Sequence, residues 1–237
     1  LFQLHGLYQK EILFLFFLVI GLLFNTSLAF TVEGRWLLCL ILFVFARIGW
    51  AGANIFYDSF LVDVTSRQRM DVISSRGYGF GYIGSVIPFL VIILLLLFAP
   101  DTGEGLPIAQ TRAGFLIVAA WWLLMSVPAV IYVKQVHYQP ISSSPVTDSF
   151  LRLGETLKNI RQYRQVFYFL IAYFFYIDGV GTVISMSTAY GRDLGFGVNQ
   201  LIMVLLFIQV IAFPCALVFG QLAVRYSPKS MIMTGIF

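Results

Sequence analysis

The chain has 237 residues, of which 59% are hydrophobic and 11% charged, and its mean hydropathy is +0.89. Soluble domains carry roughly 25% charged residues, so this composition excludes an ordinary soluble domain. The net charge is +4. We attribute this excess of basic residues to the loops between membrane spans and not to a nucleic-acid-binding surface. We therefore predict an all-α, polytopic membrane protein.

Six apolar stretches are long enough to cross a bilayer, because a hydrocarbon layer of about 30 Å requires about 20 helical residues. They cover residues 12–30, 36–57, 78–98, 113–133, 166–186 and 199–222, and a seventh begins at Met231. The first stretch also resembles a secretory signal, with Lys10 before it and small residues near Ala29. A second span that follows at Trp36 favours a membrane helix instead. Since the chain starts at Leu1 and ends at Phe237 within the seventh stretch, we expect a fragment of a longer protein.

The basic residues predict the orientation of these spans. If the end at Lys10 is cytoplasmic, the inner segments hold Lys10, Arg67, Arg69, Arg76, Lys134, Arg152, Lys158, Arg161, Arg164, Arg225 and Lys229. The outer segments then hold Arg35, Arg112 and Arg192. This bias agrees with the positive-inside rule across every span.

The longest connector, residues 134–165, is predicted to divide the chain into helical halves at 1–133 and 166–237. Its run 140–145 contains two prolines and three serines, which break regular structure. Apolar residues then recur at helical spacing at Phe150, Leu153, Leu157 and Ile160. This pattern predicts a short amphipathic helix that lies on the anionic inner leaflet, or equally a solvated linker helix.

The stretch Gly79–Gly84 matches the dinucleotide-binding pattern GxGxxG. That pattern needs a strand before it and a soluble helix after it, whereas these glycines open a bilayer-length apolar segment. Gly77, Gly81 and Ser85 are four residues apart, a spacing that lets membrane helices approach closely. We interpret the glycines as a helix-packing face.

No pattern of catalytic or metal-binding residues emerges from the sequence. Cys39 and Cys215 lie in different spans, and His5 and His137 are isolated, so neither a disulfide framework nor a metal site is predicted. A Ser, His and Asp cluster or a pair of inward carboxylates is also missing. We therefore expect neither an enzyme nor a cofactor-binding protein, and no nucleic-acid partner.

The segment Gly220–Lys229 reads GQLAVRYSPK. It resembles the G-x-L-A-D-R-x-G-x-K signature of the major facilitator superfamily, although Val224 replaces the acid and Ser227 the second glycine. In that family the signature forms a cytoplasmic turn whose charges latch the inward gate. The resemblance implies a gate or loop role for Arg225 and Lys229.

Two further regions are similar to the vacuole-effluxer-like branch of that superfamily. They are Tyr57–Asp63 with Arg69 and Gly77–Gly84, and Tyr173–Ile184, which contains an Asp-Gly-x-x-Thr stretch at Asp178. The branch includes fungal proteins associated with vacuolar amino-acid efflux. The resemblance implies a major-facilitator helical bundle in which residues 1–133 supply about helices three to six. Residues 166–237 would then supply helices seven, eight and the start of nine.

Arg47 and Asp178 are isolated charges about halfway along otherwise apolar spans. A charge at the bilayer centre costs about 2.5–3.5 kcal/mol and usually marks a solute or ion pathway. Arg47 could bind a carboxylate through its planar fork, and Asp178 could carry a proton. Because both lie near the midplane, we expect them to face a shared central cavity, one from each half. The alternative is that each is a structural charge, with Asp178 capping a bend before Gly179. Asn54 and Tyr176 are further pathway candidates, and Asp58, Asp63 and Arg69 are candidates for a gate or cytoplasmic cap.

These patterns predict a secondary transporter that moves a small solute by alternating access. We expect an amino acid as the solute, coupling to protons, and contact with membrane lipid. A non-transporting receptor or interaction protein on the same scaffold is the alternative. Short loops favour a bacterial inner membrane, with a vacuolar membrane as the second choice.

Overall fold

The computed structural model describes residues 9–99, 107–137, 151, 154–156, 158–160, 163–226 and 228–236. Every regular element in these ranges is a helix, and none of them contains a strand. The all-α prediction is confirmed. Phe150, Leu153 and Leu157 of the proposed amphipathic linker helix lie outside the described residues, whereas residues 154–156 and 158–159 are helical.

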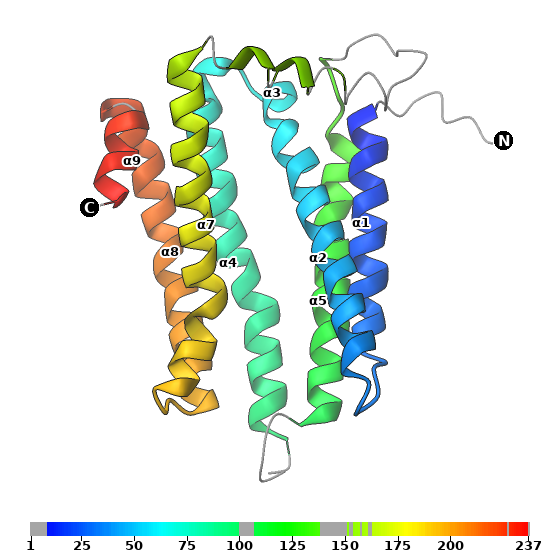
Figure 1. Ribbon diagram of the computed structural model, residues 1–237. Coiled ribbons are helices and arrows are strands. Elements are labelled where there is room, and N and C mark those ends of the chain that lie inside the picture. The colour runs from blue at the N-terminus through cyan, green and yellow to red at the C-terminus, as the bar shows by residue number, and fades with distance from the viewer. Residues whose placement is uncertain are drawn as a thin grey trace, which may run out of the picture. The chain divides into compact units, whose positions relative to one another are not determined.

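Six helices are long and apolar enough to cross a membrane, as the hydropathy pattern predicts. The elements, in chain order, are α1 (Gln9–Leu28), α2 (Trp36–Ser59), α3 (Leu61–Val64), the 3₁₀ helix η1 (Arg67–Arg69), α4 (Met70–Leu97), α5 (Ile108–Tyr132), α7 (Arg164–Asp193), α8 (Val198–Tyr226) and α9 (Pro228–Ile236) (Figure 1). Three of the long helices contain an interior proline, namely Pro88, Pro128 and Pro214.

The apolar stretches underestimate several helices because polar residues continue the helix beyond the hydrophobic window. The third span was predicted from residue 78, whereas α4 begins at Met70 and includes Asp71 and Arg76. The fifth was predicted to end at 186, whereas α7 continues to Asp193. The seventh apolar stretch is the short helix α9, which begins at Pro228, a residue well suited to a first helical position.

Two glycines with positive φ allow tight turns after α1 and α7. Gly34 has φ of 82° and Gly195 has φ of 87°, a region that favours glycine. At the end of α7, the Gly195 N–H donates to the Arg192 carbonyl at 2.9 Å and the Phe196 N–H to the Gly191 carbonyl at 3.0 Å. This pair of bonds is a Schellman motif, and it turns the chain sharply into α8.

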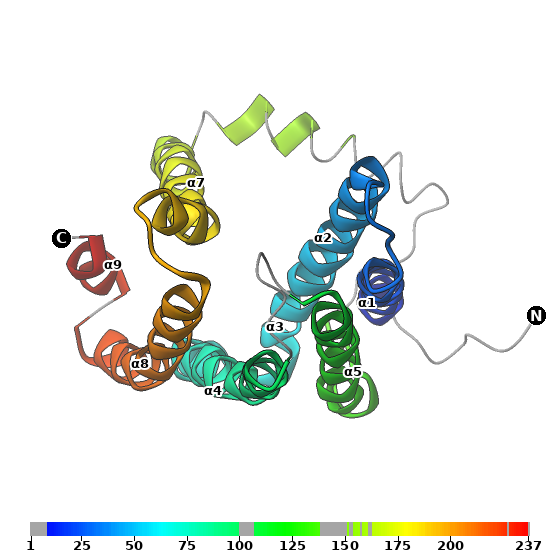
Figure 2. The same cartoon turned by 90° about the horizontal axis from the view of Figure 1, so that it is seen from below.

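Contacts divide the chain into two compact units, residues 1–138 with 205–237, and residues 139–204. In the first unit, α1 packs beside α2 and α5 (Figure 2). A Cβ on Gly49 would meet the backbone of Gly21, and one on Gly52 would meet the Phe17 ring. The rings of Phe17 and Phe56 stack with centroids 5.8 Å apart. The backbones of α1 and α2 therefore meet closely, as small residues allow between membrane helices.

The packing face of α4 differs in part from the predicted one. Gly77 and Gly81, which we expected at a helix interface, have open space around them. The contacts come from the other side of α4, where a Cβ on Gly79 would lie 3.2 Å from Leu217 and Ser75 lies against Gly220. Ser85, the third residue of the predicted face, does contact α8, because its Oγ donates to Gln209 Oε1 at 2.6 Å. The four-residue spacing therefore predicted the contact at Ser85 but missed those at Gly79 and Ser75.

Candidate functional site

Helix α2 has one face packed on α1 and an opposite face that carries its polar residues. Gly49, Gly52 and Ala53 are buried on the packed side. The polar side holds Arg47, Trp50, Asn54 and Asp58, at spacings of three, four and four residues. At 100° per residue these four positions fall within an arc of about 80°. We call these four residues the α2 polar face.

Arg47 lies on this face about midway along α2, with its guanidinium 4.6 Å from the centroid of the Trp50 ring. Both side chains are exposed. A cation over an indole ring at an exposed site gains about 0.5–1 kcal/mol. Within the described residues no carboxylate lies within ion-pair distance of Arg47.

The C-terminal part of the α2 polar face reaches the end of the helix. Asn54 is half-buried and Asp58 is exposed, and neither side chain has a polar partner in the described part of the chain. From Arg47 to Asp58 the face extends about 16 Å, at 1.5 Å per residue. A polar strip of this length on a membrane helix is expected to face water or polar side chains rather than lipid.

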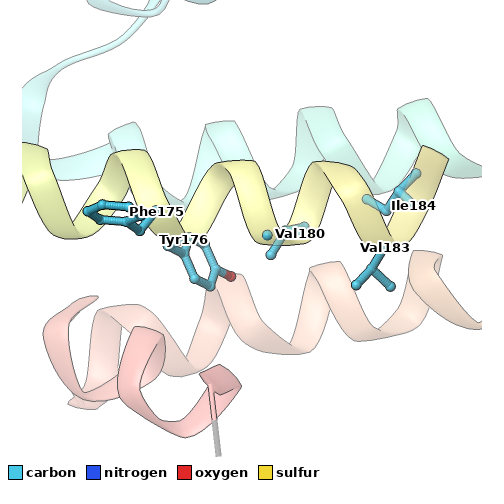
Figure 3. Close-up of a pocket in the computed structure, with 6 residues that line it drawn as sticks. Phe175, Tyr176, Val180, Val183 and Ile184 are labelled. Carbon is cyan, nitrogen blue, oxygen red and sulfur yellow. The ribbon is translucent and has the colours of Figure 1, made fainter. Parts of the chain in front are cut away.

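The other two pathway candidates, Tyr176 and Asp178, lie on α7 in the second unit. Tyr176 lines a shallow apolar groove of about 420 Å³, together with Phe175, Gly179, Val180, Val183 and Ile184 (Figure 3). Asp178 is exposed but does not line this groove. Two residues along a helix are about 200° apart, so Tyr176 and Asp178 occupy opposite sides of α7. A common cavity for Arg47 and Asp178 stays a prediction, since they belong to different units.

The five gate candidates have different surroundings. The Asp63 carboxylate is fully buried and pairs with Lys10 at 2.9 Å and with His137 at 3.1 Å. Arg69 is exposed at the end of η1. Arg225 ends α8 with its guanidinium 5.6 Å from the Tyr226 ring centroid, and Lys229 lies in α9. The structure thus joins Asp63 to residues that the sequence analysis had not grouped with it.

Sequence reasoning missed Trp50 and the partners of Asp63. Trp50 could have been found, because it lies three residues from Arg47 and therefore on the same helix face. Lys10 stands at the start of the first span and His137 just beyond the fourth. Their position at span ends was a signal, but it does not reveal which ends lie together. No group of three His, Cys, Asp or Glu side chains suited to a metal occurs among the described residues.

The family model described as vacuole effluxer Atg22 like matches residues 62–237. The chain belongs to the Atg22-like vacuole effluxer family. It is 47% identical over 230 residues to the MFS-type transporter YxiO of Bacillus subtilis, a match that covers 96% of this chain and 53% of YxiO. This confirms the predicted relationship to the major facilitator superfamily.

Fungal members of the Atg22-like family are more distant. Autophagy-related protein 22 of Coccidioides immitis is 24% identical over 83% of this chain and 42% of its own length. The protein of that name from Botryotinia fuckeliana is 29% identical over 55% of this chain and 24% of its own length. The chain thus spans about half the length of YxiO and of the Coccidioides protein. No solved structure matches it significantly.

Proposed function

We propose that the chain is part of a secondary transporter that moves a small solute across a membrane by alternating access. The observation that carries this proposal is the α2 polar face, which holds a guanidinium at the middle of a membrane-spanning helix. The relationship to an MFS-type transporter supports transport over a membrane enzyme or a receptor. The 47% identity to a bacterial protein favours a bacterial cell membrane.

The solute we propose is an amino acid. The Arg47 fork suits a carboxylate, since two parallel N–H donors match its two oxygens. Under the predicted orientation α2 runs from the outer to the inner surface, so the polar face leads from the midplane to the cytoplasm. Asn54 and Asp58 would then line the inner half of the pathway.

Asp178 is our candidate for proton coupling. It is the acidic residue in the middle of α7, a helix of 30 residues that otherwise has its charged residues at its two ends. A carboxyl group that alternates between a dry and a wet environment changes its proton affinity. Binding of solute at Arg47 and of a proton at Asp178 would then couple the transport of the solute to the transport of the proton.

Transport by the complete protein that contains this chain tests the proposal. Proteoliposomes would be loaded with buffer, given an inward proton gradient and supplied with each of the 20 labelled amino acids. We expect accumulation of at least one of them. The variant Arg47→Gln should lower its apparent affinity by about tenfold, equivalent to one lost charge-assisted bidentate contact of about 1.4 kcal/mol.

Asp178→Asn should abolish gradient-driven accumulation and leave solute exchange largely intact. The matched controls are Arg35→Gln in the turn before α2 and Asp193→Asn at the end of α7, and both should transport normally. Wild-type accumulation by Arg47→Gln and Asp178→Asn would show that both charges are structural. Solute binding without flux in the wild-type protein would indicate a receptor instead.

A further inference from the structure

Trp50, the aromatic residue of the α2 polar face, lies deep within its membrane span. At 1.5 Å per residue, it follows Trp36 at the start of α2 by about 21 Å along the helix axis. Tryptophan is common where a span meets the membrane surface, because its ring suits the headgroup level. Trp36 stands at such a position, whereas Trp50 is too far along the helix for this role.

Packing of α2 on α1 does not explain Trp50 either. The buried small residues of α2 lie on the opposite face, and Trp50 belongs neither to the core cluster nor to the residues packed against it. The Trp50 side chain is 47% exposed. What the structure does give this ring is the guanidinium of Arg47, whose carbon Cζ lies 4.6 Å from the ring centroid.

The contact with Trp50 is compatible with carboxylate binding at Arg47. An aromatic ring attracts a cation through the face of the ring. The guanidinium presents its N–H donors in a planar fork, which binds a carboxylate edge on. The ring and a carboxylate therefore use different sides of the same group, and a solute does not have to displace Trp50 to reach the fork.

The ring also restricts a side chain that is otherwise mobile. An arginine has many rotamers, and fixing them when a ligand binds opposes binding. A guanidinium that already rests on Trp50 has lost part of this freedom before the solute arrives. The attraction between ring and cation strengthens where water is scarce, as it is near the middle of a bilayer.

We propose that Trp50 is a positioning residue for the carboxylate site at Arg47. This inference rests on the proposed function, because it concerns the binding of the same solute. Trp50 acts through the guanidinium and does not itself bind the solute. Loss of the ring should therefore weaken binding of the solute and leave the rate at saturation unchanged, as expected for an interaction that the bound state and the transition state share.

The contact itself can be tested without any solute. The complete protein would be labelled with 5-fluorotryptophan, placed in nanodiscs and studied by fluorine NMR, with the Trp50 resonance assigned by its loss in Trp50→Tyr. Arg47→Gln should shift this resonance, because the cation over the ring is removed. Arg35→Gln, in the turn before α2, is the control and should leave it in place. An unchanged Trp50 resonance in Arg47→Gln would overturn the proposal.

Uptake into proteoliposomes tests the consequence for the solute. Trp50→Leu should raise the apparent KM about fivefold, equivalent to about 1 kcal/mol, with the maximal rate unchanged. Trp50→Tyr keeps an aromatic face and should stay within about twofold of the wild-type KM, which also guards against a general effect on folding. Trp36→Leu on the same helix is the matched control and should transport normally. A wild-type KM in Trp50→Leu would contradict the proposal.

A double-mutant cycle shows whether Trp50 acts through Arg47. In the Arg47→Gln background, Trp50→Leu should raise the KM no further, because the group that it positions is gone. A second fivefold rise there would mean that the ring contacts the solute directly, and positioning would be the wrong role. Uptake that depends on Arg47 but not on Trp50 would overturn this inference alone. Absence of amino-acid uptake by the wild-type protein would overturn the proposed function together with it.

Discussion

Helices α2 and α7 are both long membrane spans with interior glycines, yet they are packed very differently. Gly49 and Gly52 of α2 are buried against α1, where they face Gly21 and the Phe17 ring. Gly179 and Gly181 of α7 have open space around them, and the one buried residue of α7 is Gly191 at its end. Both helices form because a membrane span satisfies its own backbone hydrogen bonds.

The difference shows that a glycine permits close approach but does not produce it. In α2 each buried glycine meets a complementary surface, either another glycine backbone or a flat aromatic ring. In α7 the residues around Gly179 form the shallow apolar groove of Figure 3. Helix formation and helix association are separate steps in a membrane, and within their own units the two glycine pairs differ in the second step.

The largest expected effect comes from adding a side chain at the α1–α2 contact. Gly49→Leu should lower the free energy of unfolding by about 3 kcal/mol, because the backbone of α1 must move to admit the side chain. Gly181→Leu in α7 is the matched control and should change stability by less than about 0.5 kcal/mol. Unfolding in mixed micelles with increasing SDS, followed by tryptophan fluorescence, measures both. Equal effects of the two substitutions would contradict the comparison.

A smaller loss is expected when an aromatic ring is removed from the same interface. Phe14 is 6% exposed and its ring meets that of Phe60 edge to face, with centroids 6.2 Å apart. Phe14→Ala should cost about 2 kcal/mol, less than the roughly 3–5 kcal/mol of a soluble core, because lipid also solvates the helix once the contact opens. Phe174→Ala on α7, where the ring is 65% exposed, should leave the same SDS midpoint unchanged. A shift for Phe174→Ala would reveal packing on α7.

The smallest effect concerns one hydrogen bond between helices. Asn25 Nδ2 donates to the Phe115 carbonyl of α5 at 3.1 Å, and such bonds average about 0.6 kcal/mol in membrane proteins. Asn25→Leu should therefore cost about 0.6 kcal/mol. Ser185→Ala in α7 removes a hydroxyl that bonds within its own helix, to the Gly181 carbonyl at 2.8 Å, and should be neutral. A larger cost for Ser185→Ala than for Asn25→Leu would reverse the ranking.

The sequence was sufficient to predict the six spans. In the water-free interior of a bilayer, about 20 apolar residues have few ways other than a helix to satisfy their backbone hydrogen bonds. It could not give the full helices, since Asp71 and Arg76 are polar yet helical in α4. It placed Arg47, Asn54 and Asp58 on one helix, and their spacing also fixes a common face. The face of α4 that packs, by contrast, depends on the surface of α8. The periodicity of apolar and small residues in α4 carries no information about that surface.

The Asp63 cluster was not predictable for a related reason. Its members Lys10, Asp63 and His137 come from three separate parts of the sequence, and each alone resembles an ordinary charged or polar residue at a membrane surface. Only the arrangement of α1, α3 and the end of α5 brings them together. The sequence therefore indicated that Asp63 was a candidate, but not that its charge is satisfied within the first unit.

The polar face of α2 also bears on how this helix enters the membrane during synthesis. Its first ten residues, Trp36–Phe45, contain no charge, whereas Arg47, Asn54 and Asp58 all follow in the second part. On the insertion scale each Leu, Ile, Phe or Val contributes about −0.3 to −0.6 kcal/mol and a central Arg costs about 2.5–3.5 kcal/mol. The eleven such apolar residues of α2 offset Arg47 alone but leave little margin for the remaining polar groups. Insertion of this span should therefore depend on polar surroundings for the face opposite α1, because α1 covers only the face that carries Gly49 and Gly52.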